Sequence, residues 1–162
     1  ALIWGRPRLT TDVDVTVRVG TSTEALVRAL EAHGFTCRIE ATDAFIRQTR
    51  VLPLEHRASA LALDVVLAGP GLEDLFLARA VPVDVAGTRV PFISPEDLIT
   101  TKILAGRPKD LEDVRGVLSE RGDRLDVTRI RETLTQLEQA LGQGDLSPVF
   151  EGELRRWRDG RT

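Results

Sequence analysis

Apolar and polar residues alternate strictly along residues 10–19, where valines recur at every second position and Asp12 and Asp14 stand between them. Successive side chains of a β-strand point to opposite faces, so the valines share one face and the two aspartates share the other. The alternation therefore predicts a strand with one buried face and one polar face.

Patterning elsewhere predicts strands and helices up to about residue 93 and helices alone after it. The expected strands cover 35–41, 44–52, 59–68, 82–86 and 88–93, and the expected helices cover 23–33, 72–80, 94–105, 109–121, 127–141 and 148–158. Ser94 is a typical N-cap, and Pro95 follows it at the first helical position. The apolar residues 1–4, which precede Gly5, are expected to form the end of a helix.

Composition narrows the class of protein. The chain has 162 residues, of which 42% are hydrophobic and 29% charged, as is typical of a soluble globular protein. No apolar run approaches about 18 residues, so we expect no transmembrane helix, and no secretory signal is recognisable. Cys37 is the only cysteine, which excludes an internal disulfide framework and fits a reducing cytoplasm. The net charge of −3 disfavours a protein that mainly holds duplex DNA by its phosphates.

Asp12 and Asp14 are the first residues with candidate chemistry. Two residues apart on a strand, they share a face at roughly 7 Å along the backbone. Carboxylates this close repel each other unless a cation lies between them, and Mg²⁺ binds through one or two carboxylates together with substrate phosphates. The alternative is that they form the solvated face of a half-buried strand.

Asp64 is the single charge in the apolar run 59–68. An unpaired carboxylate in an apolar strand costs several kcal/mol, so it is expected to be paired or bound to metal. A strand end that reaches solvent, or a salt bridge to an arginine, would satisfy it equally. If this strand lies beside strand 10–19, three carboxylates converge, as a two-metal site for displacement at phosphorus requires.

A third candidate cluster lies in residues 102–113. Lys102 projects from a predicted helix, and Asp110 and Asp113, three residues apart, share a face of the next helix. A cation that faces carboxylates and metal ions is needed where a triphosphate must be neutralised. The alternative is a helix–turn–helix joined by salt bridges.

Two segments together resemble a known family. Residues 5–14 read Gly-x-x-Arg-x-Thr-x-Asp-x-Asp and resemble the core motif of the minimal nucleotidyltransferases of the DNA polymerase β superfamily. Residues 94–113, with Ser-Pro-Glu-Asp-Leu, Lys102 and Gly-Arg-Pro-Lys-Asp-Leu-Glu-Asp, resemble the second half of the AbiEii/AbiGii-type toxin nucleotidyltransferases and their bacterial relatives. The segments occur in the family's order, with the strand that carries Asp64 between them.

The resemblance implies an α+β fold in which a small mixed β-sheet with flanking helices is followed by a C-terminal helical segment. The nucleotidyltransferase core would cover residues 1–93, and residues 94–162 would complete the active site and pack on that core. The implied reaction moves a nucleotidyl group from an NTP to an acceptor hydroxyl, depends on Mg²⁺ or Mn²⁺, and releases pyrophosphate.

The resemblance also implies roles for individual residues. The expected metal ligands are Asp12, Asp14 and Asp64, and these three with Lys102 form the expected catalytic set. The residues expected to bind the nucleotide are Arg8, Thr10, Thr11, Lys102, Arg107, Asp110 and Asp113. The family places a Gly-Gly or Gly-Ser pair just before the position of Ala1, and because the sequence contains no Met we expect that pair in a preceding segment.

The leading hypothesis is a cytoplasmic, bacterial-type nucleotidyltransferase, toxin-like, with an antitoxin protein as a partner and no membrane. Its acceptor would be tRNA, other RNA, a protein or a small-molecule hydroxyl. A non-catalytic nucleotide-sensing or regulatory domain of the same fold is one alternative, and a purely structural interaction module is another. The basic tail 154–161 is expected either to contact RNA or to dock Trp157 on the core.

Overall fold

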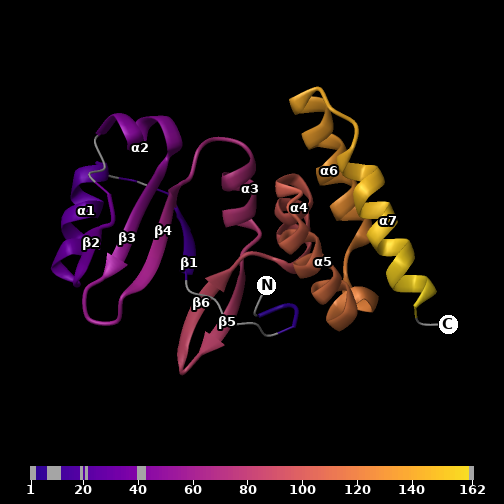
Figure 1. The fold of residues 1–162 in the computed structure, drawn as a ribbon, viewed down its shortest axis with the longest axis horizontal. Coiled ribbons are helices and arrows are strands. Elements are labelled where there is room, and N and C mark those ends of the chain that lie inside the picture. The colour runs from indigo at the N-terminus through magenta and orange to yellow at the C-terminus, as the bar shows by residue number, and fades with distance from the viewer. Residues whose placement is uncertain (1–2, 7–11, 19, 21, 40–42, 161–162) are drawn as a thin grey trace. The chain divides into compact units, whose positions relative to one another are not determined.

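A computed structural model describes residues 3–6, 12–18, 20, 22–39 and 43–160, and its fold is α+β, as predicted (Figure 1). The chain forms two compact units. One unit is Leu9–Ala78, and the other joins Ala1–Arg8 to Arg79–Thr162. The units therefore divide after residue 78, whereas the sequence suggested a boundary after residue 93.

The unit Leu9–Ala78 is built on a small mixed sheet. Its elements are β1 (Asp12–Val17), α1 (Thr23–Ala32), β2 (Phe35–Cys37), α2 (Asp43–Thr49), β3 (Val51–His56), β4 (Leu61–Leu67) and α3 (Leu72–Ala78). The strand order is β1-β4-β3-β2, in which β1 and β4 are parallel and the other neighbours antiparallel. The parallel pair is possible because α1, β2, α2 and β3 all lie between β1 and β4 in the chain.

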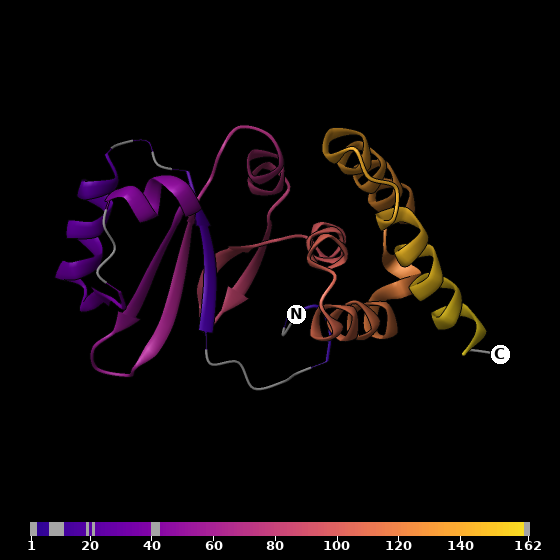
Figure 2. The same cartoon turned by 45° about the horizontal axis from the view of Figure 1, so that its top comes forward.

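One face of this sheet carries the core of the unit. Leu52, Leu54 and Val65 are buried there and pack against apolar residues of α1 and α2. Figure 2 shows these two helices next to the strands of the sheet. Val17 joins this cluster, but Val13 and Val15 are 39% and 38% exposed, so the prediction of a buried valine face along the whole strand is wrong. The reason is that β1 is the edge strand of the sheet.

The predicted strand 44–52 is also wrong, because the segment contains α2 and the start of β3. Arg50 separates them in the left-handed conformation, with φ of 57°. Its guanidinium holds this turn by donating to the carbonyl oxygen of Leu67 at 2.7 and 3.0 Å. The side chain also crosses Gly69, where an added Cβ would overlap the Arg50 guanidinium.

The second unit is a hairpin followed by helices. Its elements are β5 (Val81–Val85), β6 (Thr88–Phe92), α4 (Pro95–Ala105), α5 (Pro108–Arg121), the short 3-10 helix η1 (Gly122–Arg124), α6 (Val127–Leu141) and α7 (Leu146–Asp159). The predicted start of α4 is confirmed, since Ser94 Oγ accepts a hydrogen bond from the Asp97 amide. Across the described residues, no helix is long and apolar enough to cross a membrane.

The core of this second unit draws on both ends of the chain. Ile99, Val114, Leu118 and Phe150 are fully buried in it together with further residues of α4 to α7. Trp4 is buried in the same core and donates from Nε1 to the carbonyl oxygen of Ile93 at 2.7 Å. Residues 3–5 form a turn and a bend, so the predicted helix end is wrong for them. Trp157 also packs against this core, which is the second of the two alternatives expected for the tail 154–161.

Candidate functional site

The parallel pairing of β1 and β4 brings two of the predicted site residues together. Asp14 lies directly opposite Asp64, and Asp12 lies opposite Ala62. This confirms that the strand carrying Asp64 is the neighbour of the strand carrying Asp12 and Asp14. Because side chains alternate along a strand, all three carboxylates belong to one face, and the apolar core belongs to the other.

The spacing of the strands places the negative charges of this face close together. Neighbouring strands lie about 4.8 Å apart, so Asp14 and Asp64 are separated by one strand spacing at the backbone. Like charges at that separation raise each other's free energy unless a positive charge is near. The face therefore needs a cation, either from the protein or from solution.

For Asp64 the protein supplies that cation. The Nη2 atom of Arg38, in the bend just after β2, forms a salt bridge with Asp64 Oδ1. The two side chains are 34% and 32% exposed, so the pair is half-buried. Arg38 belongs to none of the sequence motifs described above. Its contact with Asp64 becomes visible only from the arrangement of the strands.

The preformed arrangement stops short of the expected three-carboxylate centre. Within the part of the chain that the structure describes, no group of three His, Cys, Asp or Glu side chains is arranged to hold a metal ion. The chemistry of the donors nevertheless fits Mg²⁺, which prefers oxygen ligands and binds through one or two carboxylates and substrate phosphates. Asp12, Asp14 and Asp64 are the residues that would hold it.

The fourth member of the predicted catalytic set, Lys102, lies in α4 of the second unit and faces α5. Lys102 Nζ contacts Asp110 Oδ1 at 2.8 Å and Asp113 Oδ2 at 2.9 Å. The Lys102 side chain is 20% exposed, Asp113 is 6% exposed and Asp110 is fully buried. Arg107 Nε also donates to Asp110. These residues thus form the helix–turn–helix joined by salt bridges that the sequence left open as an alternative.

Mutual neutralisation shifts the pKa values in this second cluster. Burial lowers the pKa of Lys102, but the hydrogen bonds to Asp110 and Asp113 together outweigh it, and the pKa lies above its ordinary value. Burial likewise raises the pKa of Asp110, whereas the bonds from Arg107 and Lys102 lower it by more, so that it lies below its ordinary value. Both groups are therefore held in their charged forms.

Three further residues of the predicted site cannot be placed in this geometry. Arg8, Thr10 and Thr11 lie outside the described residues. Their expected role beside the nucleotide stays a prediction.

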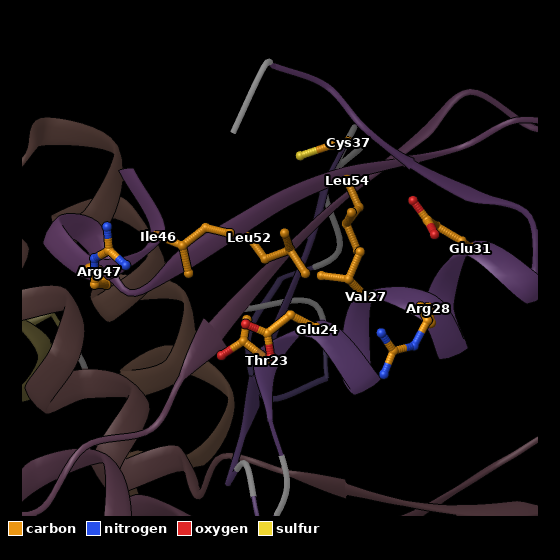
Figure 3. A pocket seen from close by; sticks show the side chains of 10 residues that line it. All are labelled: Thr23, Glu24, Val27, Arg28, Glu31, Cys37, Ile46, Arg47, Leu52 and Leu54. Carbon is orange, nitrogen blue, oxygen red and sulfur yellow. The ribbon is translucent and has the colours of Figure 1, made fainter. Parts of the chain in front are cut away.

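A cavity of about 430 Å³ opens on the helix-covered side of the sheet in the first unit. Figure 3 shows apolar side chains at its centre and charged side chains of α1 and α2 around them. Leu52 and Leu54 line it, and both belong to the face that carries the core. The cavity is therefore on the opposite side of the sheet from Asp14 and Asp64, and no sequence motif pointed to it.

Comparison with known proteins gives the family. A search of curated proteins finds no match. Residues 5–143 match the family described as nucleotidyltransferase of unknown function (DUF6036), and this match includes Asp12, Asp14, Asp64 and Lys102. Since it spans most of the 162 residues, the chain belongs to this nucleotidyltransferase family.

Proposed function

We propose that the chain is a Mg²⁺- or Mn²⁺-dependent nucleotidyltransferase that moves a nucleotidyl group from an NTP to an acceptor hydroxyl. The observation that carries the proposal is the register of β1 and β4, which sets Asp14 opposite Asp64 with Asp12 on the same face. Membership of a nucleotidyltransferase family supports the same reaction class.

The chain's own residues would divide the work as follows. Asp12, Asp14 and Asp64 would hold the divalent cation, which when bound would offset charge on the phosphates and polarise the phosphoryl oxygens. Asp64 takes up the proton of the acceptor hydroxyl as that oxygen attacks the α-phosphorus and pyrophosphate leaves. A carboxylate suits this role because its oxygens accept protons and it lies beside Asp12 and Asp14.

Lys102 has a different role in the proposal from the one suggested by the family resemblance. Direct contact with the triphosphate would require its bonds to Asp110 and Asp113 to break. Among the described residues, the positive charges of Lys102 and Arg107 already face the carboxylates of Asp110 and Asp113, which weakens their attraction for a triphosphate. We therefore assign Lys102 to positioning α5 relative to α4.

The finer features of the proposal rest on the motif resemblance. They are a relationship to the AbiEii/AbiGii-type toxins, an RNA such as tRNA or a protein as acceptor, an antitoxin as partner, and a cytoplasmic location. The donor side of the site is compatible with any of these acceptors, so the acceptor must be found by experiment.

The experiment is to incubate the protein with each of the four NTPs, labelled at the α-phosphate, together with Mg²⁺ and either total cellular RNA or total protein. We expect label to appear on one class of acceptor, in a reaction that requires the metal and releases pyrophosphate. NTP binding, seen as a raised melting temperature, without label transfer to any acceptor would contradict the proposal.

That negative outcome would favour a second candidate, a nucleotide-sensing domain that has kept the fold. The observation that favours a nucleotide-sensing domain is the salt bridge between Arg38 and Asp64, because this salt bridge occupies the carboxylate that catalysis needs. The two candidates agree on nucleotide binding and differ only in whether a covalent product forms.

A further inference from the structure

One row of residues crosses the whole sheet of the first unit. Asp14 in β1 is paired with Asp64 in β4, and Asp64 is paired with Pro53 in β3. The next residue in the row is Arg38, whose amide donates to the Pro53 carbonyl at 3.0 Å, one step beyond the last residue pair of β2 and β3. Arg38 therefore reaches Asp64 along a single row of the sheet, across one intervening residue.

Pro53, which lies between Arg38 and Asp64, helps the Arg38 side chain to reach Asp64. A proline has no N–H to return to Arg38, so it is an unusual residue for the interior of a sheet and ends the ladder at this point. The chain accordingly leaves the sheet after β2, with a bend at Arg38 and Ile39. The compact ring of Pro53, which is buried, leaves room for a longer side chain to cross it.

The neighbouring residue defines the face on which Arg38 acts. Cys37 is paired with Leu54 and lines the cavity on the core side of the sheet with it. Arg38, one residue later, extends to the opposite face and meets Asp64 there. The guanidinium of Arg38 thus lies on the side of the sheet that carries the carboxylates, and not on the side of the cavity.

We propose that Arg38 is a positioning residue that competes with a divalent cation for the Asp64 carboxylate. Without the cation, its guanidinium neutralises Asp64 beside Asp14; when the cation binds, the guanidinium gives up this carboxylate. The physical reason is that a guanidinium and a divalent ion repel each other and bind through the same carboxylate oxygens. This inference rests on the proposed function, because it takes the carboxylate face to be the cation site.

The test is a titration of the nucleotide-free protein with Mn²⁺, with the free ion followed by electron paramagnetic resonance. Arg38→Gln removes the competitor, and we expect it to bind Mn²⁺ about three- to fivefold more tightly than wild type, the upper part of the range for loss of one partly exposed ion pair. Arg38→Lys keeps the charge and should bind within about twofold of wild type.

Arg18→Gln is the matched control. Arg18 forms an ion pair with Asp74 at 2.7 Å in the same unit, and its loss changes the net charge by the same amount. Arg18 lies four residues beyond Asp14 along the chain, more than 10 Å away in an extended strand, so at about 0.1 M salt its effect on the cation should be largely screened.

The outcomes separate the inference from the proposed function. Equal Mn²⁺ affinity in wild type and folded Arg38→Gln, with weaker binding in Asp14→Asn, would overturn the role of Arg38 alone. Absence of Mn²⁺ binding in both wild type and Arg38→Gln would overturn the cation site and the role of Arg38 with it. If Arg38→Gln does not fold, the Arg38 Nε–H resonance of wild type can be followed as Mg²⁺ is added: a shift that saturates supports competition, and an unchanged resonance while Mg²⁺ binds overturns it.

Discussion

Substitution of Lys102 by methionine should destabilise the second unit strongly. The ammonium group is the shared partner of Asp110 and Asp113, which are 0% and 6% exposed. Removal of one partner from a buried ion pair leaves a buried charge and costs about 3–5 kcal/mol. Because Lys102 is itself 20% exposed and Arg107 still reaches Asp110, we place the loss at about 2–4 kcal/mol.

Urea unfolding followed by tryptophan fluorescence is the appropriate assay. Both tryptophans, Trp4 and Trp157, lie in the unit that contains Lys102, so the signal reports on that unit. Lys109→Met is the matched control, since Lys109 is the only other lysine and is exposed; we expect a change of less than about 0.5 kcal/mol.

A triple variant tests the stated cause. With Lys102→Met, Asp110→Asn and Asp113→Asn combined, no buried charge is left unpaired, and the triple variant should be more stable than Lys102→Met alone. A Lys102→Met protein whose free energy of unfolding lies within about 0.5 kcal/mol of wild type would refute the reasoning. The lysine would then be a surface charge, free to serve the nucleotide.

The remaining predictions concern pH, a close contact and the carboxylate face. Glu153 in α7 forms an ion pair with Arg115 of α5, whose hydrogen bonds lower the pKa of Glu153. Because the pKa values of Asp110 and Glu153 are both lowered, their ion pairs stabilise the fold above the ordinary carboxyl pKa of about 4 and lose this contribution as pH falls through the folded-state values; urea unfolding between pH 7 and pH 2.5 should show this loss. For Lys102, whose pKa is raised, the contribution is complete below its ordinary pKa and is lost only as pH rises through the folded-state value, so stability at pH 7 to 9 should not change on its account. Gly69→Ala should displace the Arg50 side chain from the Leu67 carbonyl and cost about 1 kcal/mol, measured by chemical denaturation; an unchanged stability would show that the contact is dispensable. Asp12→Asn with Asp14→Asn should abolish any gain in melting temperature from Mg²⁺ with NTP, whereas a metal response equal to that of wild type would rule out these ligands.

Local patterns in the sequence predicted several elements of the fold. The alternation in 10–19 and the apolar run 59–68 predicted two strands, and the structure confirms that they are neighbours. The start of α4 followed from Ser94 and Pro95, whose capping preferences are local properties.

What the sequence did not reveal depends on contacts between distant segments. Phe45 and Ile46 stand close to Val51 and Leu52, and the apolar pattern alone joined them into one strand, because the left-handed turn at Arg50 is stabilised by the distant Leu67 carbonyl. Arg38 escaped notice for the same reason, since its partner Asp64 is 26 residues away.

Lys102 shows the limit of a motif. Its spacing to Asp110 and Asp113 is equally compatible with a triphosphate contact and with a salt-bridged pair of helices, and only the distances in the structure favour the second. Burial, which the sequence does not state, decides which role the charge can take.

The most direct test of the central claim is transfer of an α-labelled nucleotide by wild type, Asp14→Asn, Asp64→Asn and Arg18→Gln, compared under identical conditions with Mg²⁺. The account predicts transfer by wild type and by Arg18→Gln, and a loss of at least about 10²-fold in each aspartate variant, the size expected when a group that acts in the transition state is removed. Transfer by Asp14→Asn and Asp64→Asn at the wild-type rate would contradict the assignment of this sheet face as the active site.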